Sequence, residues 1–125
     1  MLTLRALTWG RFLLLLLSAL AVPVASAEAA AAVLQGLDKV TAKVSTFDAP
    51  IGETVHFGTL AITARTCNKR PPEEPPEAAA FLEIDEVRPG QPPSRIFTGW
   101  MFASSPALSA LEHPVYDVWV IDCKK

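Results

Sequence analysis

Short segments in which apolar and polar side chains alternate recur along this chain, and they constrain its fold more than any other feature. Alternation at every second residue places the apolar side chains on one face of an extended strand. Five segments alternate in this way, at residues 39–47, 53–57, 59–67, 81–87 and 94–102. A sixth, residues 115–123, is apolar on both faces, as is typical of a central strand. The pattern predicts one mainly β domain, a small sandwich or barrel of about six strands.

Two segments between the predicted strands have a different character. Residues 68–77 contain four prolines interleaved with glutamates, a composition that cannot form a regular ladder and is typical of an extended surface loop. Ser105 is a suitable cap for a short helix with Pro106 at its first position. We expect this helix to run through Leu108 and Leu111 and to end before the last strand.

The first 27 residues have the features of an export signal. Arg5 and Arg11 form a positive region, residues 12–22 are almost entirely apolar, and residues 25–27 are the small residues that a signal peptidase prefers. We expect cleavage after Ala27. The alternative is a permanent membrane anchor, which needs about 20 consecutive apolar residues. The apolar run is too short for that, so no permanent anchor is expected.

Cleavage would leave a lead segment at residues 28–38, followed by a single β domain at residues 39–125. Two of the eleven basic residues lie in the leader, so nine remain against thirteen acidic residues, a net charge of −4. Nucleic-acid binding depends on a basic face, and attraction to anionic lipid depends on the same charge. We therefore expect neither kind of partner.

Cys67 and Cys123 are the two cysteines of the chain. Export would bring them into an oxidising compartment, so we expect them to form one disulfide that staples the small domain. Strict alternation places Cys67 on the polar face of its strand. Either a bulge intervenes, or the disulfide lies at the rim of the sheet.

One set of side chains has the residue types of a hydrolase triad: Ser104 or Ser105 with His113 and Asp117. The chain has no Gly-x-Ser-x-Gly segment to present a nucleophilic serine on a sharp turn. Helix capping accounts for both serines without catalysis. We therefore expect no catalytic residue here.

His56, His113 and the two cysteines are formally sufficient to ligate a metal ion. They lack the closely spaced pairs that structural zinc sites use, and oxidation would remove the thiolates. A solvated strand position explains His56, and the end of the short helix explains His113. The sequence therefore predicts neither a metal nor another cofactor.

Residues 99–106 are the most suggestive of a binding function. Trp100 and Phe102 share one face of their strand, and we assign them to the core because a small domain needs its aromatic residues inside. Met101 points the other way, towards an expected exposed apolar patch of the kind that marks partner sites. Loops carried by a rigid sheet are where binding residues concentrate. The candidate partner-binding residues are Met101, Ser104, Ser105, Leu108 and Leu111.

Several blocks of the chain together resemble a known family. The blocks are residues 34–42, 57–60, 67–72, 99–108 and 113–119. They resemble a family of small exported proteins of Gram-negative bacteria, catalogued only as domain of unknown function 2155. The resemblance covers nearly the whole chain after residue 27. It implies a periplasmic location and a domain with two cysteines, and it implies no activity.

The sequence therefore predicts a periplasmic, non-enzymatic binding or accessory protein of the cell envelope, whose partner is another envelope protein. Two alternatives remain open. One is an envelope hydrolase that uses Ser104 or Ser105 with His113. The other is a metal-binding periplasmic protein that uses His56 and His113.

Overall fold

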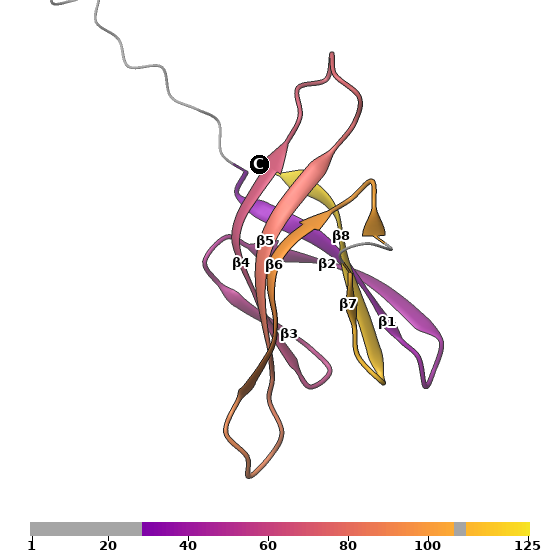
Figure 1. The fold of residues 1–125 in the computed structure, drawn as a ribbon, viewed down its shortest axis with the longest axis vertical. Coiled ribbons are helices and arrows are strands. Elements are labelled where there is room, and N and C mark those ends of the chain that lie inside the picture. Colours follow the sequence, from indigo (N-terminus) through magenta and orange to yellow (C-terminus); the bar gives the residue numbers. More distant parts are fainter. Residues whose placement is uncertain (1–28, 107–109) are drawn as a thin grey trace, which may run out of the picture.

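Two antiparallel β-sheets form the domain in this computed structural model, which describes residues 29–106 and 110–125 (Figure 1). These described residues contain eight strands: β1 (Ala31–Asp38), β2 (Lys43–Pro50), β3 (Thr54–Phe57), β4 (Leu60–Lys69), β5 (Ala78–Glu86), β6 (Ser94–Phe102), β7 (Leu111–Glu112) and β8 (Tyr116–Lys124). The strand order is β2-β1-β8-β7 in sheet A and β3-β4-β5-β6 in sheet B. The prediction of a mainly β domain is confirmed, with two more strands than the alternation predicts.

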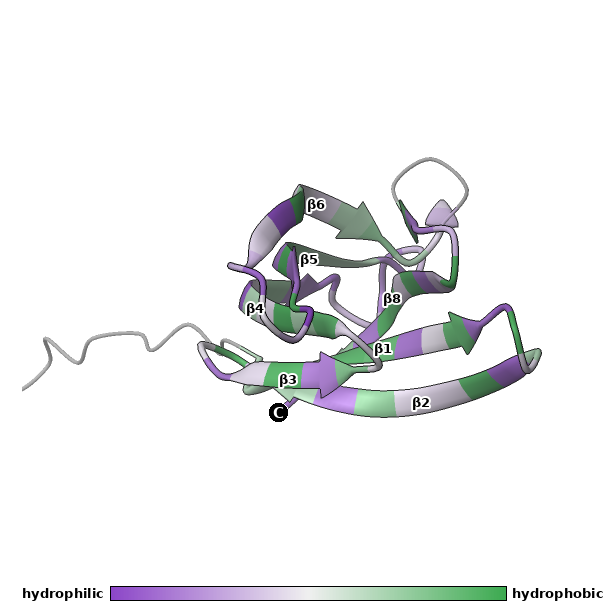
Figure 2. Cartoon of the chain, turned by 90° about the horizontal axis from the view of Figure 1, so that it is seen from below, coloured by the Kyte–Doolittle hydropathy of each residue, from purple (hydrophilic) through white to green (hydrophobic). Residues whose placement is uncertain are grey.

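The two sheets pack face to face as a sandwich around an apolar core. Figure 2 shows β5 and β6 lying above β1 and β2. Alternate residues of the strands point into the space between the sheets, as the period-two pattern requires. The largest fully buried side chains are Leu34, Leu60, Ile62, Leu82, Ile84, Met101, Val118 and Val120.

Strand β1 lies in the segment that the sequence predicts as a lead, and it is a central strand of sheet A, between β2 and β8. Its alanines and its glycine have low strand propensity, so local preference does not reveal it. Gly36 is required because the ring of Phe57 packs directly on it. A Cβ atom added at Gly36 would lie 2.6 Å from Cζ of Phe57. Packing between the sheets therefore defines this strand.

The first predicted strand begins four residues too early, because residues 39–42 form the turn between β1 and β2. The Asp38 carboxylate accepts hydrogen bonds from the backbone N–H groups of Val40 (2.9 Å) and Thr41 (3.3 Å). Ala42 takes a positive φ of 58°, and Val40 is 79% exposed. An aspartate that bonds the next backbone groups favours a turn over an extended strand.

The predicted helix before the last strand is wrong at its C-terminal end. The backbone N–H of Ala110 donates to the carbonyl of Pro106 at 2.9 Å, which is a helical contact, but Leu111 begins strand β7. Leu108 lies in residues 107–109, outside the described residues. The chain is extended again at Leu111 because β7 pairs with β8 there.

Cys67 and Cys123 form the predicted disulfide, which joins β4 of sheet B to β8 of sheet A. The Cα atoms of the two cysteines are 5.7 Å apart. The register of β4 against β5 shifts between Ala64 and Thr66, which makes Arg65 a bulge. An extra residue reverses the alternation of a strand. Both Ala64 and Cys67 consequently face the core, so a bulge resolves the conflict over the face of Cys67.

The connection between β4 and β5 projects from one end of the sandwich, at the top of Figure 1. Strand β4 continues through Lys69, so the proline-rich loop begins later than predicted. The backbone N–H of Arg70 donates to the carbonyl of Glu77 at 3.0 Å, which closes the base of this hairpin. Within the two described ranges, no helix is long and apolar enough to cross a membrane.

Candidate partner-binding face

Three aromatic side chains gather on the outer face of sheet B, at the end that carries the disulfide. Phe81 of β5 lies opposite Trp100 of β6, and their ring centroids are 5.6 Å apart in an edge-to-face arrangement. Phe102 lies opposite Ala79, two residues further along. Trp100 is 42% exposed and Phe102 is 41% exposed. Phe81, Trp100, Phe102 and Ala79 together form the aromatic face.

This arrangement reverses the orientation that the sequence predicts for β6. Met101 is only 1% exposed, so the prediction of core positions for Trp100 and Phe102 and of an exposed Met101 is wrong. The inner row at this end is Met101, Ala80 and Cys67, and the disulfide ties the two sheets together there. Methionine has a flexible side chain that fills irregular spaces in a core, which suits this inner position.

The other predicted partner-binding residues lie in different environments. Leu111 is buried in the core, so it cannot contact a partner, and the prediction is wrong for this residue as it is for Met101. Leu108 lies outside the described residues. Ser104 is exposed and Ser105 is half-buried, just after the end of β6. The loop after β6 contributes serines at the border of the aromatic face, while Met101 of β6 and Leu111 of β7 lie in the core.

Phe81 is missing from the predicted site, although the sequence holds a signal for it. Its side chain has the same strand parity as Glu83 and Asp85, and charged residues mark the solvent face of a strand. The antiparallel register then places Phe81 beside Trp100. The charged residues of β5 therefore predict that the rings of Phe81 and Trp100 both lie on the solvent face of the sheet.

A groove with a volume of about 390 Å³ borders the aromatic face. Phe102, Ala79 and Pro71 give it an apolar wall, and Lys69 and Arg70 lie along it as cations. Glu77 also lines the groove, and Lys69 is paired with Asp122. A molecule lying against this end of sheet B would therefore meet apolar surface bordered by charges of both signs.

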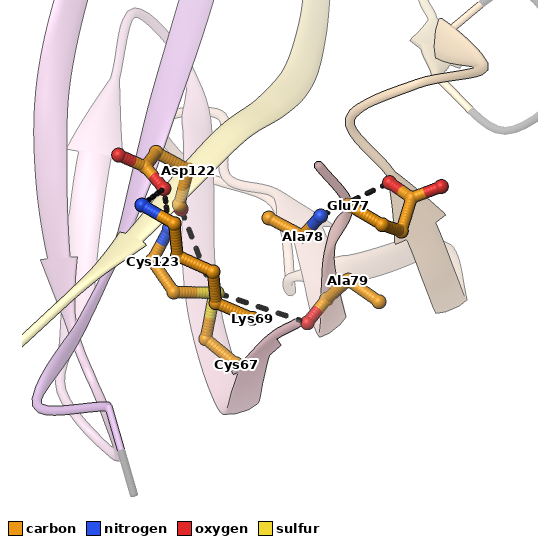
Figure 3. The surroundings of a disulfide bond; sticks show 7 residues. All are labelled: Cys67, Lys69, Glu77, Ala78, Ala79, Asp122 and Cys123. Atoms are coloured by element: carbon orange, nitrogen blue, oxygen red, sulfur yellow. Dashed lines mark hydrogen bonds and ion pairs between the residues drawn. A yellow bond between two sulfur atoms is a disulfide. The ribbon is translucent and has the colours of Figure 1, made fainter. Parts of the chain in front are cut away.

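Asp122 of β8 fixes the position of Lys69, next to the disulfide (Figure 3). The Nζ atom of Lys69 lies 2.9 Å from Oδ1 of Asp122, and the backbone N–H of Cys123 donates to the same carboxylate at 2.8 Å. The hydrogen bond from Lys69, and then that from Cys123, hold the pKa of Asp122 below its ordinary value. This ion pair ties the side of the groove to the opposite sheet.

Glu77 holds the loop that follows β6. Its carboxylate accepts hydrogen bonds from the hydroxyl of Ser104, from the backbone N–H of Ser104 (3.1 Å) and from the backbone N–H of Ala78 (3.0 Å). The two bonds from Ser104, led by the hydroxyl, hold the pKa of Glu77 below its ordinary value. Ser104 is therefore a structural link between this loop and the start of β5.

His113 is not arranged for the hydrolase alternative. Its Nε2 atom pairs with the carboxylate of Glu86 at the end of β5, and its Nδ1 atom accepts the backbone N–H of Val115 at 3.0 Å. Both ring nitrogens are thus engaged, and the hydroxyl of Ser104 is bonded to Glu77. A general base needs a free nitrogen within hydrogen-bond reach of its serine. Ser104 and His113 do not form such a pair.

The metal-binding alternative gains no support from the geometry. Both cysteines are in the disulfide, and His56 is exposed on β3, where the sequence predicts a solvated position. Over the described ranges, no three histidine, cysteine or acidic side chains are grouped as metal ligands.

The other half of the outer face of sheet B carries charged side chains that pair with one another. Arg65 donates two hydrogen bonds to Glu83, at 3.1 and 3.2 Å. Arg95 pairs with Asp85 and lies 3.4 Å from Glu83. The hydrogen bond from Arg65 lowers the pKa of Glu83. The outer face therefore consists of an uncharged aromatic end and a charge-paired end.

Comparison with known proteins identifies relatives but no activity. A family model described as "Uncharacterized protein conserved in bacteria (DUF2155)" matches residues 32–123, which include the aromatic face and both cysteines. An uncharacterized protein of Rickettsia prowazekii is 32% identical over 87 residues, which are 70% of this chain and 56% of that protein. The chain therefore spans little more than half the length of that relative. No solved structure matches the chain significantly.

Proposed function

The chain belongs to the bacterial family DUF2155, as its sequence resemblance indicates, and we propose that it is a non-enzymatic accessory protein that binds a protein partner through the aromatic face. The proposed location is the periplasm, and the proposed partner is another protein of the cell envelope. The family description names no activity, so the proposal depends on the surface of this chain.

The exposure of Trp100 and Phe102 carries the proposal. Both rings are more than two-fifths exposed, while Met101 between them is buried. Partner sites are enriched in tryptophan and contain contiguous apolar surface. Complete burial of a large apolar side chain is worth about 1.5–3 kcal/mol, and a partner that covers the exposed two-fifths of each ring gains roughly that share of it.

The features of the N-terminal sequence and the disulfide support the proposed location. Residues 1–27 have the charge, apolar run and small residues of an export signal. The disulfide between β4 and β8 is of a kind that persists in oxidising compartments. N-terminal sequencing of the chain from the periplasmic fraction should therefore begin at Glu28. A chain that retains Met1 and remains in the cytoplasm would contradict this location.

Site-specific photo-crosslinking in living cells tests the proposed face. Asn68 is exposed, lies opposite Ala79 and borders the groove, so it is a suitable position for a crosslinking amino acid. Val44 is a matched control because it is 53% exposed on β2 of the other sheet. We expect one discrete protein adduct from position 68 and none from position 44.

The outcome at the two positions decides the proposal. Equal adducts from both positions would indicate non-specific contact. Absence of any adduct from position 68, with the protein folded and exported, would contradict a partner on this face.

A further inference from the structure

Three of the four edge strands in the described part of the chain are protected against further strand pairing. β3 has four residues and β7 has two, so neither offers a long edge. β2 is longer, but it begins with Lys43, carries Asp48 and ends with Pro50. Short length, charge and proline are the devices by which natural sheets prevent edge-to-edge association.

The fourth edge strand, β6, is protected over only part of its length. Its first half carries Arg95 and a register shift against β5, between Ile84 and Asp85, which twists the edge. From Ile96 to Phe102 the strand has no ionisable side chain and no proline. β5 is its one hydrogen-bonded neighbour among the described strands. The uncharged edge from Ile96 to Met101 has the features of a template for another strand, whereas the carbonyl of Phe102 already accepts the backbone N–H of Ser105 at 3.2 Å.

We propose that β6 pairs with β6 of a second copy of this chain, antiparallel and across a two-fold axis at Gly99. An added strand supplies the row of backbone N–H and C=O groups that an edge requires. The two B sheets would then form one continuous sheet. A symmetric dimer uses the same surface on both copies, so this surface must match itself.

Charge and register favour a second copy as the occupant. With the axis at Gly99, Thr98 faces Trp100 of the second copy, and the two Trp100 rings are diagonal neighbours on the outer face. Diagonal positions across antiparallel strands are within reach of aromatic side chains. Arg95 then lies opposite Ala103 of the second copy, beyond the uncharged stretch. No charge is buried, because each copy brings the same uncharged residues.

The dimer would join two aromatic faces into one wider surface. This inference does not depend on the proposed function, because β6 could pair in the absence of any other partner. A single strand pair buries less surface than the roughly 1,200–2,000 Å² of a standard interface. We therefore expect a weak dimer that forms in the micromolar range or above.

Sedimentation equilibrium of the purified chain over a wide concentration range tests the dimer. Thr98→Lys places a lysine on the unprotected edge, close to the lysine of the other copy. Thr46→Lys is the matched control, because Thr46 is exposed on the outer face of edge strand β2. We expect Thr98→Lys to raise the dimer dissociation constant at least about tenfold and Thr46→Lys to leave it unchanged. Circular dichroism and thermal unfolding confirm that both variants fold.

Hydrogen exchange locates the interface independently of the variants. The backbone amides of Thr98 and Trp100, which face away from β5, should exchange more slowly at high concentration, and those of β2 should not change. A monomer at every concentration, a dimer insensitive to Thr98→Lys, or protection confined to β2 would overturn the proposal. A strictly monomeric chain that still yields an adduct from position 68 would reject the dimer and leave the proposed function intact.

Discussion

Removal of the disulfide between Cys67 and Cys123 should destabilise the domain by about 4 kcal/mol. The bridge closes a sequence separation of 56 residues. Loop-closure entropy for that length is about 14 cal/mol/K, or about 4 kcal/mol at 25 °C. The closed segment contains β5, β6 and β7, so the reduced chain must order half of the sandwich without this tether. The two sulfur atoms are also buried, so their packing is lost as well.

Urea and thermal unfolding of Cys67→Ala/Cys123→Ala against the unmodified chain measure this effect. One kcal/mol shifts the melting temperature of a domain of this size by about 4–8 °C, so the expected loss is about 15–30 °C. Reductant supplies the control. It should lower the stability of the unmodified chain to that of the double variant and leave the double variant unchanged.

A loss below about 1 kcal/mol would refute this reasoning. It would mean that the reduced unfolded chain is already restricted, or that the apolar core holds the two sheets together without the link. In either case the disulfide could not be the feature that compensates for a small core.

Three further changes test other parts of the structure. Gly36→Ala should cost about 1–3 kcal/mol by forcing the new methyl group against the Phe57 ring, and Phe57→Leu should recover part of that loss in urea unfolding. Met101→Ala should cost about 2–5 kcal/mol and Trp100→Ala clearly less, because only the methionine is buried; equal losses would contradict the assigned orientation of β6. The pKa of Glu83 lies below its ordinary value of 4.5, so its stabilisation is complete above that pH and is lost as pH falls through the lower folded value. Glu83→Gln should therefore weaken the fall of the urea midpoint between about pH 5 and pH 3, and an unchanged profile would show that this carboxylate is not responsible.

The sequence predicted a strand correctly where the alternation of its own residues is sufficient to define it. The alternation over residues 94–102 matches β6, and that over 53–57 nearly matches β3. β1 was not predictable in this way, because Gly36 has low strand propensity and is ordered by the Phe57 ring from the other sheet. The start of β2 was misplaced because a side chain of the preceding residue, Asp38, stabilises a turn.

The candidate face was harder to predict than the fold, because alternation separates the two faces of a strand without showing which one the other sheet covers. In β6 the choice depends on the inner neighbours of Met101, which are Ala80 and the disulfide on adjacent strands. A prediction from β6 alone assigns the larger side chain, Trp100, to the core. The structure assigns it to the surface and places Met101 in the inner row beside Ala80.

The most direct test of the aromatic face compares adduct yield from a crosslinker at position 68 in two backgrounds. One carries Trp100→Ser and Phe102→Ser, and the other carries Val40→Ser and Val44→Ser, which remove exposed apolar side chains from β2 and from the turn before it. The aromatic face as the binding surface predicts that the adduct disappears in the first background and persists at full yield in the second. An adduct of undiminished yield without Trp100 and Phe102, in a chain that remains folded, would contradict the central claim.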